Sequence, residues 1–291
     1  MSIENRSAGY LQLGTANFGS KYGITNSTLL EQSEIVSILD WSFGKIKTLE
    51  TSLDYTGSIA CIADHAKKFG ISTKIDLQKI ENVKEIRHVL YDLIDKLDIQ
   101  SFNTVLIREN ENIQMSKFRD AVSELEGLVD EGLIEKIGFS LYSPLKIIEY
   151  GATSPSGKVF QVPLNLADKK FEIFVKNNWE SCSRHTFIAR SVFLQGLLLS
   201  RPTLLPSNLQ TFHKFLGTLR SIAKNRETTV MQICVDYIRR QDWLDSCVIG
   251  TNALTQLKEV YEAFVNPIIS DHLYAEKLPH LNSDLVDPRL W

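Results

Sequence analysis

Residues 104–140 read TVLIRENENIQMSKFRDAVSELEGLVDEGLIEKIGFS. This stretch begins with one short strand-like run, Thr104–Ile107, and ends with another, Lys136–Ser140. Both runs have the length typical of buried strands. Between the two runs, apolar side chains recur at helical spacing from Phe118 to Val129. A strand, a helix and a second strand in this order predict a βαβ unit with two parallel strands.

The same alternation continues along the whole chain. The strand candidates are Leu11–Gly14, Lys47–Thr51, Ile71–Lys74, Thr104–Ile107, Lys136–Ser140, Val159–Val162, Thr186–Ser191 and Ser246–Ile249. Helical spacing also runs from Ile86 to Leu97 and from Leu254 to Phe264. The 291 residues therefore fit a single-domain (β/α)8 TIM barrel, an α/β fold, with a C-terminal extension over about residues 265–291.

An open, doubly wound sheet is the alternative arrangement for repeated βα units. The phosphate-binding signatures of such open folds are GxGxxG and GxxxxGK[ST], placed between a strand and a helix. Neither signature follows any of the strand candidates. We therefore expect the sheet to close into a barrel.

The composition is that of a globular protein with a small-molecule partner. The chain is 43% hydrophobic and 23% charged, with a formal net charge of −3. This balance gives no electrostatic reason to expect a nucleic acid or an anionic membrane as partner. The first 14 residues lack the basic and apolar regions of a signal peptide, and no apolar run of about 18 residues occurs. We expect a cytoplasmic protein.

Cysteine and histidine residues give no sign of a disulfide framework or a metal site. Cys61, Cys182, Cys234 and Cys247 are far apart in the chain, which favours free thiols in a reducing compartment. The six histidines fall in predicted helices, in the C-terminal tail or just before the seventh strand. None of them has the spacing of a ligand set, so we expect no metal.

Small and polar residues gather where the predicted strands end. They are Gly14 and Thr15, Glu50, Lys74, Arg108, Ser140, Gln161, Arg190 and Ser191, and Gly250 and Thr251. Each of these residues taken alone could be a turn residue that faces solvent. The carboxyl ends of all strands in a barrel surround one mouth, however, so these residues are expected to converge on one site.

Glu50, Tyr55 and Lys74 have a plausible joint chemistry at such a mouth. A tyrosine hydroxyl is a poor proton donor at neutral pH unless its neighbours lower its pKa. The charge of Lys74 would lower the pKa of Tyr55, and Glu50 would hold Lys74 in its charged form. A purely structural Glu50–Lys74 ion pair is the alternative.

Longer stretches add a second line of evidence. They are LQLGTANFGSKYG at 11–23, LETSLDY at 49–55, STK at 72–74, LVDEGLIEKIGFSLYSP at 128–144, QVPLN at 161–165, RSVFLQGLLL at 190–199 and DPRLW at 287–291. In these stretches, and in their order, the chain resembles the aldo-keto reductases. It is most similar to the branch associated with bacterial surface-polysaccharide and sugar pathways.

This resemblance implies that the chain reduces a carbonyl group with hydride from a nicotinamide. Tyr55 then matches the family's proton donor, and Lys74 and Glu50 match the residues that tune it, with Glu50 in place of the usual Asp. The family's catalytic His is replaced by Arg108. Since Arg cannot act as a neutral donor, Arg108 is expected to stabilise an oxyanion and further lower the pKa of Tyr55, to bind an anionic substrate group, or to fill the pocket.

The resemblance also implies the residues that hold the dinucleotide. Ser140 and Gln161 would bind the nicotinamide carboxamide, although Leu141 replaces the usual Asn, and Arg190 would stack on the nicotinamide ring. The remaining expected contacts are Gly14, Thr15, Ser191, Gln195, Gly196, Gly250, Thr251, Asn252, Gln256 and Glu259. Phosphate groups would lie near the helix amides at 250–259.

The expected cofactor is NAD(H) or NADP(H). Members of the family that prefer NADP commonly place Lys and Arg against the 2′-phosphate, where this chain has Gly250 and Gln256. The loss of charge-assisted hydrogen bonds predicts that NAD(H) binds at least as well as NADP(H).

Two functions are consistent with these residues. The first is an NAD(P)H-dependent oxidoreductase that interconverts a carbonyl and an alcohol, on a small carbonyl compound, a sugar or a nucleotide sugar. The alternative is a catalytically impaired barrel that binds the dinucleotide as a sensor or a partner subunit, because Arg108 and Leu141 depart from the family pattern. A metal-dependent hydrolase is disfavoured by the lack of ligands at the strand ends.

Overall fold

Eight parallel strands close into a barrel in chain order, which confirms the predicted fold class. The computed structural model describes residues 10–21, 23–24, 29–154, 157–205, 207–267, 278–279, 281 and 283–291. The strands are β1 Leu11–Gly14, β2 Thr48–Glu50, β3 Gly70–Ile75, β4 Phe102–Arg108, β5 Ile134–Ser140, β6 Gly157–Pro163, β7 Thr186–Arg190 and β8 Ser246–Gly250. The barrel closes where β8 pairs with β1, with Gly250 opposite Gly14.

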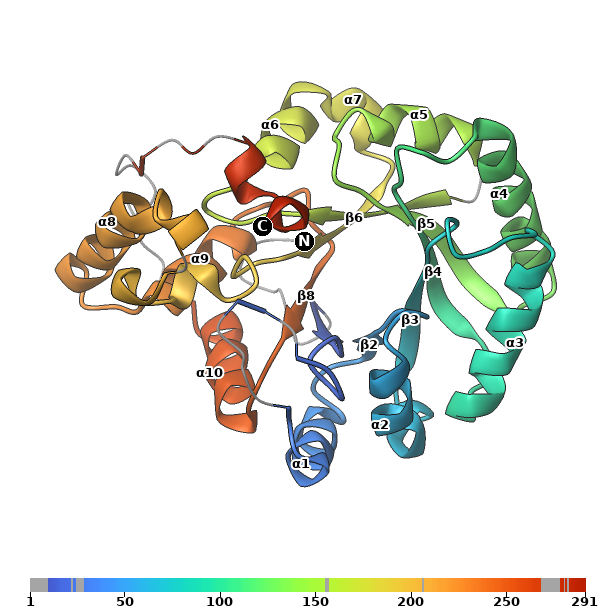
Figure 1. The fold of residues 1–291 in the computed structure, drawn as a ribbon, viewed down its shortest axis with the longest axis horizontal. Coiled ribbons are helices and arrows are strands. Elements are labelled where there is room, and N and C mark those ends of the chain that lie inside the picture. The colour runs from blue at the N-terminus through green and yellow to red at the C-terminus, as the bar shows by residue number, and fades with distance from the viewer. Residues whose placement is uncertain are drawn as a thin grey trace.

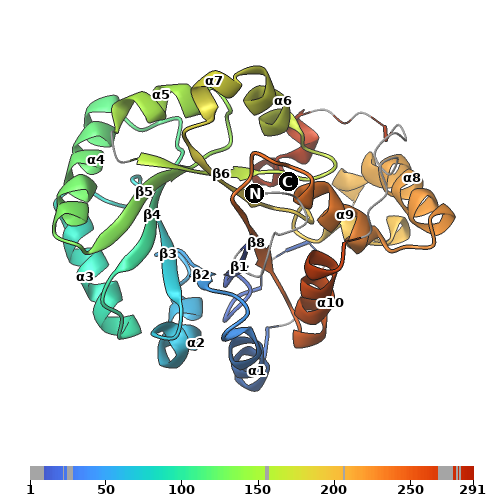
Figure 2. The same cartoon turned by 180° about the vertical axis from the view of Figure 1, so that it is seen from behind.

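Helices surround the strands on the outside (Figures 1 and 2). They are α1 Gln32–Ser42, α2 Thr56–Ala66, α3 Glu85–Leu97, α4 Met115–Asp130, α5 Lys146–Thr153, α6 Lys170–Asn177, α7 Trp179–Cys182, α8 Phe212–Asn225, α9 Val230–Arg239 and α10 Leu254–Val265. The helical segments predicted from apolar spacing are α3, α4 and α10. No helix in the described part of the chain is long and apolar enough to cross a membrane.

The apolar core has two parts. The larger part joins the outer faces of the strands to the helices and includes Val105 and Ile107 of β4. Leu106 lies between these two residues, so it faces the barrel interior, where it packs with Val159 and Ile188. Neighbouring Gly138 leaves the space that this packing needs, because a Cβ there would lie 2.8 Å from a Leu106 methyl carbon.

The four cysteines are free thiols, as expected, and three of them are buried. Beyond α10, the structure describes two short 3₁₀ turns, Ser283–Val286 and Pro288–Leu290, in the predicted C-terminal extension.

Candidate active site

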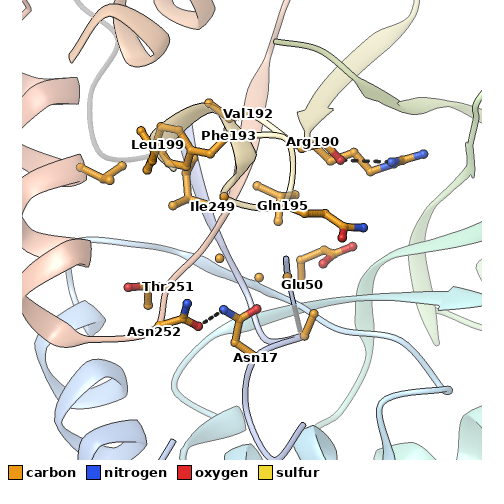
Figure 3. A pocket seen from close by; sticks show the side chains of 18 of the residues that line it. Asn17, Glu50, Arg190, Val192, Phe193, Gln195, Leu199, Ile249, Thr251 and Asn252 are labelled. Carbon is orange, nitrogen blue, oxygen red and sulfur yellow. Dashed lines mark hydrogen bonds between the residues drawn. The ribbon is translucent and has the colours of Figure 1, made fainter. Parts of the chain in front are cut away.

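A cavity of about 920 Å³ opens at the carboxyl ends of the strands (Figure 3). Most of the residues predicted from the sequence line it: Gly14, Glu50, Tyr55, Lys74, Arg108, Ser140, Arg190, Ser191, Gln195, Gly196, Gly250, Thr251, Asn252, Gln256 and Glu259. Thr15 and Gln161 do not line the cavity, and both are fully buried. The hydroxyl of Thr15 instead accepts a hydrogen bond from Ser58, at 2.6 Å. The topology of the barrel therefore unites residues that are far apart in sequence.

A chain of polar contacts crosses the base of the cavity. The Ser140 hydroxyl donates to Gln161 Oε1 at 3.0 Å, and Gln161 Nε2 donates to Glu50 Oε1 at 3.0 Å. The same carboxylate oxygen accepts a hydrogen bond from the Lys74 ammonium. All four residues are buried. Gln161 thus helps to hold the Glu50 carboxylate in position through this hydrogen bond. The sequence did not predict this contact.

Tyr55 lies at the start of α2 and lines the cavity. Lys74 Nζ is 5.7 Å from the centre of the Tyr55 ring. No described residue makes a hydrogen bond with the Tyr55 hydroxyl, so this group is available to a ligand. Burial, and then the charge of Glu50, raise the pKa of Tyr55 well above its usual range, while Arg108 and Arg190 act to lower it.

This balance corrects the expectation that Lys74 lowers the pKa of Tyr55. The ammonium of Lys74 is paired with Glu50, so its charge is largely compensated before it can act on the phenol. The cations that lower the Tyr55 pKa come from β4 and the end of β7 instead.

Arg108 is held by carboxylates rather than standing free in the cavity. Its Nη1 lies 3.1 Å from Asp54 Oδ2 and 3.8 Å from Asp76 Oδ2, and its Nη2 donates to Ser52 Oγ at 3.4 Å. Asp54 also pairs with Lys79, at 2.7 Å. The positive charge that replaces the family's histidine is thus partly compensated, by partners that were not predicted from the sequence.

Arg190 extends from the end of β7 and points away from Thr251 and Asn252 (Figure 3). Its guanidinium carbon lies 4.2 Å from the centre of the Tyr142 ring. Nη2 donates to the Leu141 carbonyl at 2.9 Å. The guanidinium therefore lies over a protein ring, and Tyr142 is a cavity residue that the sequence did not predict.

The loop after β7 has an unusual backbone. Ser191, Leu194 and Gln195 have φ values of 57°, 49° and 54°, in the left-handed region that non-glycine residues rarely adopt. Residues that follow β1 contact the loops after β7 and β8. The Ile24 N–H donates to the Gln195 carbonyl at 3.2 Å, and Asn17 Nδ2 hydrogen-bonds to Asn252 Oδ1 (Figure 3).

The amides at the start of α10 are already occupied. The Leu254 N–H donates to Glu34 of α1 at 2.6 Å, and the Asn252 N–H donates to Gln256 Oε1 at 3.1 Å. A phosphate group at Asn252 or Leu254 would therefore have to displace one of these side chains. Glu34 in addition brings a negative charge to this helix end.

Within the described residues, no group of three or more His, Cys, Asp or Glu side chains could hold a metal ion.

Comparisons with known proteins agree with this architecture. No curated protein sequence matches the chain. An aldo-keto reductase from Bacillus halodurans in its holo form is 18% identical, with a TM-score of 0.73, and the match covers 94% of this chain and 93% of that one. The glycerol dehydrogenase from Gluconobacter oxydans is also 18% identical, with a TM-score of 0.69 and coverage of 94% of each chain. A likeness at this identity shows the fold alone.

The family itself is shown by a sequence model. The model of the aldo/keto reductase family matches residues 44–275, which is well over half of the chain. The matched region contains Tyr55, Lys74, Arg108 and Arg190. This chain belongs to the aldo/keto reductase family.

Proposed function

We propose that the chain is an oxidoreductase that reduces a carbonyl group to an alcohol with NAD(P)H, with Tyr55 as the proton donor. The observation that carries the proposal is the position of Tyr55 beside the buried Glu50–Lys74 pair in the cavity, with a hydroxyl that no described residue hydrogen-bonds. Family membership supports the reaction class. The sequence motifs support a sugar or a nucleotide sugar as substrate.

The cavity suits a dinucleotide. Its volume of about 920 Å³ is large, and its lining changes from charged side chains near Tyr55 to small and amide residues near Gly250 and Asn252. Ser140 would hold the carboxamide, Arg190 would lie against the nicotinamide, and the loop after β7 would hold the pyrophosphate. When bound, the reduced nicotinamide supplies a hydride to the carbonyl carbon.

Tyr55 then completes the reduction by giving its proton to the carbonyl oxygen. The raised pKa of Tyr55 keeps the phenol protonated before the reaction. Arg108 and Arg190 favour the phenolate that the transfer leaves, and solvent returns the proton in the next cycle. Gln161 and Lys74 hold Glu50 in place, so the negative charge nearest the phenol stays fixed.

NAD(H) is proposed to bind at least as well as NADP(H). Gly250 and Gln256 offer no cation to a 2′-phosphate, and Glu34 places a carboxylate at the adjacent helix end. An additional phosphate there meets a negative charge instead of a charge-assisted partner.

Two measurements test the proposal. Fluorescence titration with NADH and NADPH should give saturable binding, with an NADPH dissociation constant no lower than that of NADH. Tyr55→Phe should reduce turnover by roughly 10²–10⁴-fold and leave dinucleotide affinity nearly unchanged, because the hydroxyl acts on substrate. Equal, negligible turnover by the wild type and Tyr55→Phe, over a panel of aldehydes, ketones and sugar nucleotides, would contradict the reductase.

A dinucleotide-binding barrel without catalysis is the second candidate. The observation in its favour is the pairing of Arg108 with Asp54 and Asp76, which leaves this residue less free to polarise a carbonyl. Saturable dinucleotide binding together with the negligible turnover described above would select this function.

A further inference from the structure

Two guanidinium groups enclose the ring of Tyr142. The guanidinium carbon of Arg190 is 4.2 Å from the ring centre, and that of Arg289 is 3.7 Å from the same centre. Groups this close to the centre of a ring lie over its face, and two of them on one face would overlap. Arg190 and Arg289 therefore stack on opposite faces of Tyr142.

The two arginines belong to different parts of the molecule. Arg190 lines the cavity at the end of β7, whereas Arg289 lies in the last 3₁₀ turn of the chain, Pro288–Leu290. Asp287 fixes the outer guanidinium, because Arg289 Nε and Nη2 donate to its two carboxylate oxygens at distances from 2.6 to 3.1 Å. The stack thus connects the C-terminal segment to the cavity wall.

The backbone beneath the ring is fixed as well. Glu109, which follows β4 and is 5% exposed, accepts hydrogen bonds from the N–H groups of Tyr142 and Ser143. The ring of Tyr142 can still turn about its side-chain bonds, so its orientation depends on what packs against its two faces.

Other contacts anchor the C-terminal segment without Arg289. Val286 is buried in the main core. Trp291 Nε1 donates to the Leu285 carbonyl at 2.9 Å, and the Trp291 ring meets Phe212 of α8 edge to face at 6.2 Å. A change at Arg289 should therefore leave the segment docked.

We infer that Arg289 is a positioning residue for the cavity: through the ring of Tyr142, it sets the place of the Arg190 guanidinium. Two guanidinium groups packed over the ring restrict its rotation, and the ring in turn supports Arg190, whose Nη2 also donates to the Leu141 carbonyl. The inference rests on the proposed function, in which Arg190 contacts the nicotinamide. It makes the end of the chain a determinant of dinucleotide affinity.

A double-mutant cycle tests this coupling. NADH dissociation constants are measured by fluorescence for the wild type, Arg289→Ala, Tyr142→Leu and the double variant, with Tyr142→Phe as the variant that keeps the ring. Arg289→Ala should weaken binding about threefold to tenfold in the wild-type and Tyr142→Phe backgrounds. It should have no further effect in the Tyr142→Leu background, since no ring remains to transmit it.

Leu290→Ala is the matched control, because Leu290 is the neighbouring residue and is 65% exposed. It should bind NADH like the wild type. Binding by Arg289→Ala equal to that of the wild type overturns the positioning role while the proposed function stands. If Arg289→Ala weakens NADH binding equally in the wild-type and Tyr142→Leu backgrounds, the positioning role is also overturned, because Arg289 would then not act through the Tyr142 ring. A wild type that binds neither NADH nor NADPH overturns the proposed function and the inference together.

Discussion

Tyr55 lies among charges of both signs, and its ionisation depends on the balance between them. Burial and Glu50 raise its pKa, and the two nearby arginines oppose this effect. The neutral phenol therefore dominates at physiological pH, which suits a proton donor more than a proton acceptor. Reduction and oxidation should consequently respond differently to pH.

Carbonyl reduction should be independent of pH between about pH 6 and pH 9, because the raised pKa keeps Tyr55 protonated throughout this range. Alcohol oxidation needs the phenolate, so its rate should rise about tenfold per pH unit, without a plateau below about pH 10. Initial-rate profiles of kcat/KM in both directions measure this difference. A reduction profile that falls with an apparent pKa near neutrality contradicts the assignment of that proton to Tyr55.

Asp54→Asn should move the oxidation profile to lower pH by about one unit. The carboxylate of Asp54 compensates both Arg108, at 3.1 Å, and Lys79, at 2.7 Å. Its neutralisation leaves more positive charge near Tyr55 and so lowers the pKa of the phenol. Asp98→Asn is the matched control, since Asp98 pairs with Lys67 on the exposed surface. If both variants have the wild-type profile, Arg108 does not act on Tyr55 through its charge.

At the scale of the elements, the strand ends and the Glu50–Lys74 pair were predictable from the sequence, and most other side-chain partners were not. Each of the eight predicted strands is present, and strand direction alone brings Ser140 and Gly250 to the same mouth. The contact between Glu34 and Leu254 spans 220 positions, and it depends on how α1 and α10 pack. Spacing along one element carries no information about such a contact, so the capped helix end was missed.

Glu34→Gln should shift the dinucleotide preference toward NADPH. The carboxylate of Glu34 caps the Leu254 N–H at 2.6 Å, and an amide can keep this hydrogen bond without the negative charge. The ratio of the NADPH to the NADH dissociation constant should fall by about threefold to tenfold, mainly through tighter NADPH binding. Glu31→Gln, an exposed neighbour just before α1, is the control. An unchanged ratio would mean that Glu34 is too far from the 2′ position to affect it.

On the scale of the whole molecule, the same closed sheet forms the barrel interior and positions the residues of the cavity. The barrel interior below the mouth is filled by Leu106, Val159 and Ile188, and charged and polar groups begin at Lys74 and Glu50. Because every strand is bonded to two neighbours, the interior cannot collapse around a missing side chain without distorting the sheet. Loss of volume there should affect the unfolding of the entire chain.

Leu106→Ala should lower the free energy of unfolding by about 2–5 kcal/mol, toward the upper end of that range because the closed sheet limits relaxation. Leu106 is fully buried, while Leu145, which precedes α5, is 72% exposed and serves as the control. Leu145→Ala should change the same quantity by less than about 0.5 kcal/mol. Urea denaturation followed by circular dichroism measures both variants. Leu106 does not line the cavity, so the folded variant should bind NADH with nearly wild-type affinity. An equally small effect of both substitutions would show that the barrel interior is not close-packed at Leu106.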